Sequence, residues 1–295
     1  MKSFFCSVFF LQLIFAISSY GQKKYQPPFF VFNNGLRDNM YNTAEKQVDL
    51  LHSLGYDGME KEGFDGLDTL LQELDKQQKK LFCIYVNVNL DPGKPYYDAR
   101  LAETLKKLKG RGTMLWINIT SSEGIYPPSS HAGDTAAVRI IRDVADLANT
   151  QGIRIILYPH TWLWLERFDH GLQLVEMINR QNVGITFNLP HYLAQARIGE
   201  EQQIAGLLKK AGKKLFAVSI CGATITEKKD RANIWDSLIQ PLGQGNFDNA
   251  TILKTLKQIK FDGPVGLQCY NIKGDKKAIL KQSMDAWNVL IKKIN

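Results

Sequence analysis

The chain has 295 residues, of which 44% are hydrophobic, and its 37 Lys and Arg against 29 Asp and Glu give a formal net charge of +8 at pH 7. The lysines occur as dispersed pairs such as Lys106-Lys107 and Lys209-Lys210, several of them at the ends of predicted helices, where cations complement the helix dipole and face water. No aromatic residues interleave with these pairs to form a base-stacking groove. We therefore expect no nucleic-acid partner.

The N-terminal residues have the pattern of a signal peptide. Lys2 is followed by the apolar stretch 4–17 and then by small residues that end at Gly21, after which we expect cleavage. A retained membrane anchor is the alternative, but the apolar stretch is shorter than the ~20 residues that span hydrocarbon. Cys6 comes too early to be the lipid-accepting cysteine of a lipoprotein. The prediction is a signal peptide at 1–21 and an exported domain at 22–295, periplasmic or secreted, with no stable membrane anchor.

Short apolar runs and helical patterns alternate eight times along the rest of the chain. The predicted strands are 29–33, 57–61, 81–89, 114–119, 153–160, 183–188, 215–221 and 265–270. The predicted helices are 44–54, 67–74, 99–108, 136–148, 172–178, 200–211, 250–259 and 276–291. Eight equal units without a linker predict an α/β fold, a (β/α)8 TIM barrel in a single domain. A doubly wound sheet is the alternative, but residues 33–38 are no dinucleotide-binding fingerprint.

Two other features refine this prediction. Long stretches rich in turn-forming residues, 121–134 and 222–248, follow the fourth and seventh strands, and we expect them to act as lids over a pocket, with plain surface loops as the alternative. Cys83, Cys221 and Cys269 each lie in a predicted strand, so we expect small buried core residues and no disulfide framework.

Polar, uncharged side chains occupy the ends of most predicted strands. Because side chains alternate along a strand, one parity faces the barrel axis. Buried amides without partners cost roughly 1–3 kcal/mol each, so this set predicts a wet cavity or a hydroxylated ligand. Taken singly, a strand-end amide often satisfies a neighbouring backbone group and a single histidine is often a core residue, but these ends converge on one place. The residues in question are Trp116, Asn118, Tyr158, His160, Asn188, His191, Ser219 and Gln268.

Aromatic residues near the same ends offer faces on which a sugar ring can stack. They are Trp116, Trp162, Trp164 and Tyr270, although Trp162 and Trp164 can equally form apolar cover over a helix start.

At these residues the chain resembles the xylose isomerase-like barrel superfamily, which includes sugar isomerases, ketose 3-epimerases, inosose dehydratases and endonuclease IV. The resemblance spans nearly all of the predicted mature chain. It rests on residues 54–60 (LGYDGME), 152–160 (GIRIILYPH), 188–191 (NLPH), 243–248 (GQGNFD) and 263–268 (GPVGLQ).

The resemblance implies a divalent metal held by Glu, Asp, His and Glu on strands five to eight, the two glutamates serving also as acid and base. This sequence has Tyr158, Asn188, Ser219 and Gln268 at those positions, so all four ligands are replaced. Carboxylates are what a hard cation requires, and the replacements retain hydrogen bonding without the charge. We therefore expect no metal cofactor. His191 matches a histidine that contacts substrate in relatives, and His160 and Glu60 remain beside it.

Three functions compete. The first is an exported isomerase or epimerase, or a lyase, acting on a carbohydrate or keto-sugar without a metal, with His160, His191 and Glu60 as catalytic residues. Its substrate-binding residues would be Tyr158, Asn188, Gln268, Ser219, Asn118 and Trp116. The second is a pseudoenzyme that binds sugar without converting it. The third, a DNA-repair nuclease, ranks last because that chemistry needs several metals and many carboxylates.

Overall fold

The computed structural model describes residues 24–122, 124–226 and 232–295. The predicted signal peptide at 1–21 therefore lies outside the described residues. Within them, no helix combines the length and the apolar character that crossing a membrane requires.

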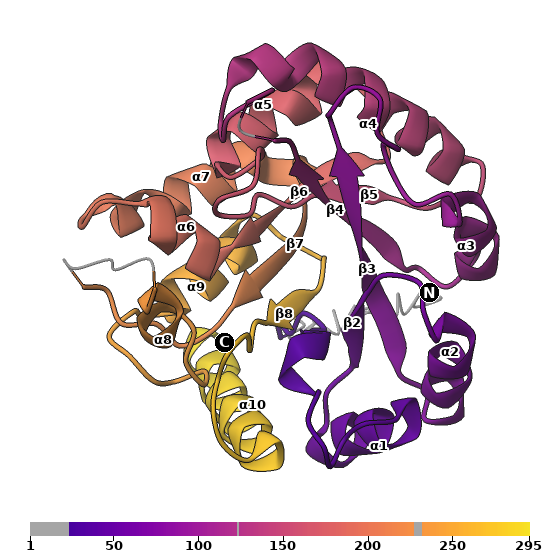
Figure 1. The fold of residues 1–295 in the computed structure, drawn as a ribbon. Helices are drawn as coiled ribbons and strands as arrows, with labels where there is room; N and C mark the ends of the chain where they lie inside the picture. The colour runs from indigo at the N-terminus through magenta and orange to yellow at the C-terminus, as the bar shows by residue number, and fades with distance from the viewer. Residues whose placement is uncertain (1–23, 123, 227–231) are drawn as a thin grey trace, which may run out of the picture.

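Eight parallel strands form a closed barrel in which each strand pairs with its neighbour in the chain and β1 pairs with β8. This confirms the predicted (β/α)8 barrel, and Figure 1 shows the helices arranged around the ring of strands. The strands are β1 (Phe29–Val31), β2 (Gly58–Glu62), β3 (Lys80–Asn89), β4 (Met114–Thr120), β5 (Ile155–Leu157), β6 (Val183–Asn188), β7 (Leu215–Ile220) and β8 (Val265–Leu267).

The α-helices follow the predicted pattern with two additions. The additions are α6, directly after β6, and α8, inside the 222–248 stretch. The helices are α1 (Ala44–Leu54), α2 (Leu67–Lys76), α3 (Leu101–Leu108), α4 (Asp134–Asn149), α5 (Phe168–Ile178), α6 (Leu189–Gln195), α7 (Ile204–Ala211), α8 (Ile234–Leu238), α9 (Ala250–Gln258) and α10 (Lys276–Ile294).

Local chemistry explains where these elements begin and approach one another. The Thr43 hydroxyl caps α1 by accepting from the backbone N–H of Lys46, and Gly55 ends the helix in the left-handed conformation. Gly58 starts β2 where a Cβ atom would lie 1.9 Å from the carbonyl oxygen of Lys80, so only glycine allows this close approach. Both strand faces are buried in β6, as expected for a parallel strand inside a layer of helices.

The apolar core has two parts. One fills the space between strands and helices, and the other fills the barrel interior. The interior part is aromatic, with the ring of Trp116 at its centre, packed against Phe30, Phe32 and Tyr158. This packed aromatic layer lies directly below the polar residues at the strand ends.

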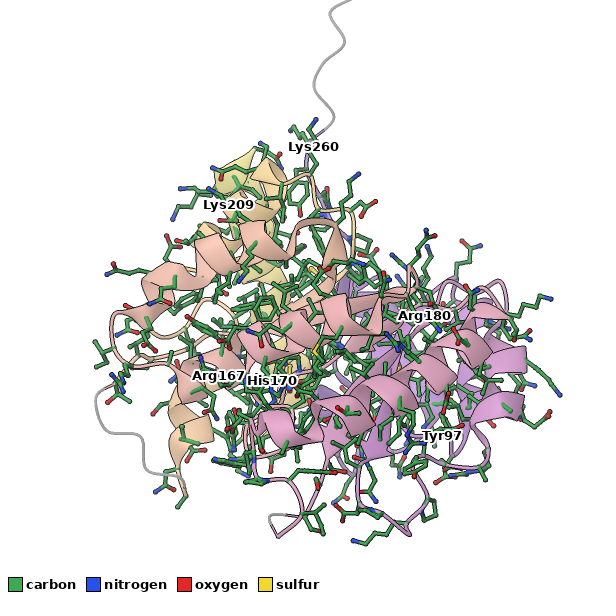
Figure 2. The ribbon with its side chains drawn as sticks, turned by 90° about the horizontal axis from the view of Figure 1, so that it is seen from above. Tyr97, Arg167, His170, Arg180, Lys209 and Lys260 are labelled. Atoms are coloured by element: carbon green, nitrogen blue, oxygen red, sulfur yellow. The ribbon has the colours of Figure 1, made fainter. Side chains whose placement is uncertain are left out.

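The cysteines and lysines behave as expected. Cys83, Cys221 and Cys269 are free and buried. Exposed lysines form surface ion pairs, for example Lys106 with Glu103 and Lys281 with Asp285. Lys209 and Lys260 lie at the periphery of the molecule (Figure 2).

Candidate active site

A cavity of about 350 Å³ opens at the carboxyl ends of the strands, a volume within the usual range for small-molecule sites. We call it the mouth cavity. Five of the nine predicted site residues line it: Glu60, Tyr158, His160, His191 and Gln268. The other lining residues are Phe32, Asn34, Glu62, Tyr85, Trp162, Trp235, Ile239 and Tyr270.

The Tyr158 hydroxyl stands at the centre of a buried hydrogen-bond cluster. The Asn188 side-chain N–H2 donates to it over 2.5 Å, and the Gln268 side chain also hydrogen-bonds it. The Tyr158 ring packs edge-on against Trp116, with centroids 4.8 Å apart. Burial is the first cause that raises the pKa of Tyr158 well above its ordinary value, so the phenol stays protonated and remains a hydrogen-bond donor.

The backbone sets the orientation of the two amides. The Asn188 Oδ1 atom caps α6 by accepting from the backbone N–H of His191 over 3.3 Å. The Gln268 Oε1 atom accepts from the backbone N–H groups of Cys269 and Tyr270 and from the Asn34 side chain, at 2.9–3.0 Å. A backbone N–H can only donate, so both amide oxygens are engaged and the N–H2 groups turn toward Tyr158.

His160 and His191 lie side by side, with ring centroids 3.9 Å apart. The His160 Nδ1 atom is 2.9 Å from the carbonyl oxygen of Thr161, and since a carbonyl only accepts, Nδ1 carries the proton and Nε2 is left as the basic nitrogen. Burial lowers the pKa of His160, and burial together with the charge of His160 lowers the pKa of His191 well below its ordinary value. Both rings are therefore neutral at pH 7.

Glu60 is a buried carboxyl group on β2, on the side of the barrel opposite the two histidines. Its Oε2 atom accepts from the backbone N–H of Asn33 over 2.9 Å. Burial raises its pKa to about 8, an effect that outweighs the opposing Asn33 hydrogen bond. The group is therefore mostly protonated at pH 7 and able to donate a proton.

Aromatic side chains border the opening. Trp162 and Trp235 meet edge to face, with centroids 5.3 Å apart, and the Trp235 ring also contacts His191 at 5.2 Å. Trp162 has a φ of 70°, which is unusual for a bulky residue, and its backbone N–H donates to Glu166. Strained backbone held in this way is frequent at functional sites. Trp164, in contrast, is buried cover, donating from Nε1 to the Ser130 carbonyl.

Four predicted site residues lie beneath the cavity wall. Trp116, Asn118, Asn188 and Ser219 are all buried and do not line the cavity. Asn188 acts through Tyr158, and Ser219 pairs with Asn188 in the strand register. Trp116 Nε1 and Ser219 Oγ have no hydrogen-bond partner among the described residues. Direct contact of these four side chains with a ligand stays a prediction.

The two long loops differ in what they contribute to the cavity. The 222–248 stretch carries Trp235 and Ile239 into the lining, as a lid would. The described part of 121–134 supplies no lining residue and packs against Trp164, so a lid role for this loop stays a prediction. Trp235 is the main lining residue that the sequence pattern did not single out, and a tryptophan in a polar loop is the available signal.

Fold and site together define a (β/α)8 barrel protein with a small-molecule cavity at the carboxyl ends of its strands. The chain belongs to the xylose isomerase-like TIM barrel family, whose model matches residues 48–290.

Among curated relatives, an inosose isomerase of Bacillus licheniformis is 28% identical over 141 residues, which is 46% of this chain and 46% of that protein. The similarity thus spans about half the length of the curated relative. Among solved structures, an L-ribulose 3-epimerase superposes with a TM-score of 0.71 at 14% identity, covering 91% of this chain and 96% of the other. A D-allulose 3-epimerase from Methylomonas sp. in complex with D-allulose gives 0.66 at 19% identity, covering 89% and 96%.

Proposed function

We propose that the protein is an exported epimerase or isomerase that moves a proton at the carbon beside the carbonyl of a keto-sugar or related polyol, without the divalent metal of its family. The observation that carries this proposal is the presence, in one cavity, of a protonated carboxyl group and neutral imidazoles. Glu60 has its pKa raised to about 8, whereas His160 and His191 have theirs lowered. Environments that push two pKa values apart are what acid and base roles at one pH require.

The strand positions suggest how inversion would occur. Glu60 stands on β2, and His191 follows β6, four strands away in the closed ring of eight. A substrate between them meets a base on one face and an acid on the other. In the forward direction the C–H proton passes to the imidazole, the electron pair moves toward the carbonyl oxygen, and the Glu60 proton reaches the same carbon from the opposite face. The Glu60 carboxylate and the imidazolium then return to their starting protonation states by exchanging protons with water. Alternatively, they catalyse the reverse reaction, in which the carboxylate is the base and the imidazolium the acid.

Developing charge on the carbonyl oxygen needs a hydrogen-bond donor. The Tyr158 hydroxyl lines the mouth cavity and accepts from Asn188, which leaves its own proton free to point toward a substrate oxygen. We assign it the role of electrophile.

The donor set does not fit the family's cation. At the four positions that the resemblance assigns to ligands stand a phenol, a hydroxyl and two amides. The oxygens of both amides are engaged by backbone N–H groups, and their N–H2 groups face the site. Amide nitrogen does not bind a hard cation, which needs anionic or carbonyl oxygen.

Hydrogen exchange tests the function most directly. The protein, dialysed against EDTA, would be incubated in D2O with ketopentoses, ketohexoses and an inosose, and deuterium beside the carbonyl would be followed by NMR. We expect exchange with inversion for at least one compound. Glu60→Gln should keep exchange but lose inversion, because the imidazoles then act from one face only. Activity that disappears with EDTA and returns with Mn²⁺ would refute metal independence.

A sugar-binding protein without catalysis is the second candidate, favoured by the aromatic border of Trp162, Trp235 and Tyr270. Calorimetric binding of a sugar that shows no exchange and no product would support it over the epimerase.

A further inference from the structure

His131, Asp134 and His170 form a cluster away from the mouth cavity. His131 Nδ1 lies 2.9 Å from Asp134 Oδ2, and His170 Nε2 lies 2.7 Å from Asp134 Oδ1. The two imidazole rings meet edge to face with centroids 4.6 Å apart. In the part of the chain that the structure describes, this is the one group of three or more His, Cys, Asp or Glu whose ligand atoms lie within 4.8 Å of one another.

Two separate segments bring the cluster together, the turn that leads into α4 and the start of α5. His131 lies in the short turn His131–Gly133 before α4, Asp134 is the first residue of α4, and His170 lies in the first turn of α5. Figure 2 shows His170 beside Arg167 at the start of α5. None of these residues lines the mouth cavity or occupies a position that the family resemblance assigns to a metal ligand.

Neighbouring contacts hold the turn in place. Trp164 Nε1 donates to the Ser130 carbonyl over 3.1 Å, and the Ser129 N–H donates to the Trp164 carbonyl over 2.9 Å. A Cβ atom on Gly133 would lie 2.7 Å from the Trp164 ring, so the turn sits directly on that side chain. The ligand atoms are therefore largely positioned in advance, which lowers the entropic cost of binding.

The ligand chemistry selects the kind of ion. Two imidazoles and one carboxylate suit Zn²⁺ and its neighbours in the first transition series, whereas Mg²⁺ and Ca²⁺ prefer oxygen. In a tetrahedral Zn²⁺ site the ligand atoms stand about 3.4 Å apart, given Zn–N bonds near 2.05 Å. The imidazole nitrogens lie 2.7 and 2.9 Å from the two oxygens of Asp134, and one ligand atom from each residue lies within 4.8 Å of the others, so small side-chain shifts reach that spacing.

Burial grades from one side of the cluster to the other. The side chain of His170 is 3% exposed, that of Asp134 14% and that of His131 67%. An ion can thus enter past His131 and complete its coordination with water on the exposed side.

We propose that His131, Asp134 and His170 form a Zn²⁺-type site that ties the end of the 121–134 stretch to the start of α5. The site is independent of the epimerase proposal, because it shares no residue with the mouth cavity.

Zn²⁺ titration of untagged, EDTA-stripped protein tests the proposal, with isothermal calorimetry and melting temperature as readouts. One equivalent should bind and raise the melting temperature, as expected for a ligand that binds only the folded state. His131→Ala, at an exposed position, and Asp134→Asn, which keeps a hydrogen-bonding group of the same shape, should each weaken binding at least tenfold. His52→Ala, an exposed histidine on α1, is the matched control and should bind as the wild type does.

Binding that is unchanged in both His131→Ala and Asp134→Asn would overturn the proposal. So would binding lost in His160→Ala, since that result would place the ion at the mouth cavity. Absence of any binding at micromolar Zn²⁺ would leave the cluster as a plain hydrogen-bonded contact between α4 and α5.

Discussion

The rings of His160 and His191 lie 3.9 Å apart between centroids, closer than any other aromatic pair at the mouth of the barrel among the described residues. Two positive charges at this distance would repel strongly in a partly dry site. Protonation of either ring therefore opposes protonation of the other, as the lowered pKa of His191 beside His160 indicates. The pair therefore carries one positive charge at most, which suits a base that must be neutral before it acts.

Replacement of His160 or His191 by alanine should reduce proton exchange by about 10²- to 10⁴-fold, the usual contribution of a general base. The melting temperature should change little for His160, which lies at the cavity wall. Exchange rates and thermal unfolding check this, with His52→Ala as a surface control. Retained exchange in both variants would remove the histidines from the mechanism.

Epimerisation, which needs Glu60 as well as the imidazoles, should have a plateau near neutral pH and fall above about pH 8. Glu60 donates only while protonated, and its pKa is raised to about 8. On the acid side, activity should fall only below the ordinary histidine range, because the pKa values of His160 and His191 are lowered. A profile of kcat/KM against pH measures both limbs. An alkaline limb far from pH 8 would argue against Glu60 as the acid.

Glu60→Gln should stabilise the protein increasingly as the pH rises. The folded state holds the Glu60 proton up to about pH 8, whereas an unfolded carboxyl releases it near pH 4.3. The contribution of Glu60 to the free energy of unfolding is thus fully present below pH 4.3 and is lost as the pH rises toward 8. The loss is on the order of 5 kcal/mol, at 1.36 kcal/mol per pKa unit. Urea unfolding at pH 5 and pH 8.5 compares the two proteins. A difference in unfolding free energy that stays constant with pH would contradict the buried acid.

Tyr158→Phe should lower kcat by about 10²-fold, since it removes the donor assigned to the carbonyl oxygen. It should also destabilise the fold by roughly 1–3 kcal/mol, because the Asn188 N–H2 loses the hydroxyl to which it donates. Tyr85→Phe is the matched control, as Tyr85 lines the same cavity with its ring edge-on to Tyr158 at 5.2 Å. Equal losses of kcat in the two variants would show that the Tyr158 hydroxyl is not the donor to the carbonyl oxygen.

Trp235→Ala should raise KM or the dissociation constant of a sugar about tenfold, because packing the C–H face of a sugar ring on an indole buries apolar surface worth on the order of 1–2 kcal/mol. Trp235→Phe should keep most of the affinity. Steady-state kinetics and calorimetry report both. Unchanged affinity in the alanine variant would show that α8 and its tryptophan lie over the cavity without touching the ligand.

The order and nature of the main elements could be predicted because the signals are local. The run 183–188 and the pattern 44–54 match β6 and α1 at both ends, since the apolar pattern lies within each segment and the caps of α1, Thr43 and Gly55, stand directly beside it. The same alternation predicted which faces of the strands point inward. Tyr158, His160 and Gln268 were identified in this way. Glu60 and His191 followed from the family resemblance instead, and all five meet in one cavity.

The tertiary structure alone decided how deeply each site side chain is buried, which way it points and which residues it contacts. Parity places Trp116 and Tyr158 on the same inner face, but only the stagger of the barrel puts Tyr158 in the cavity wall and Trp116 beneath it. The turning of the Asn188 amide toward Tyr158 depends on a backbone N–H of α6, and α6 is too short to show a periodic pattern. His170 meets Asp134 across 36 residues because α4 packs on α5, a contact that no local signal in the chain encodes. Local propensity acts over a few residues, whereas the chemistry of this protein arises where distant segments share one small volume.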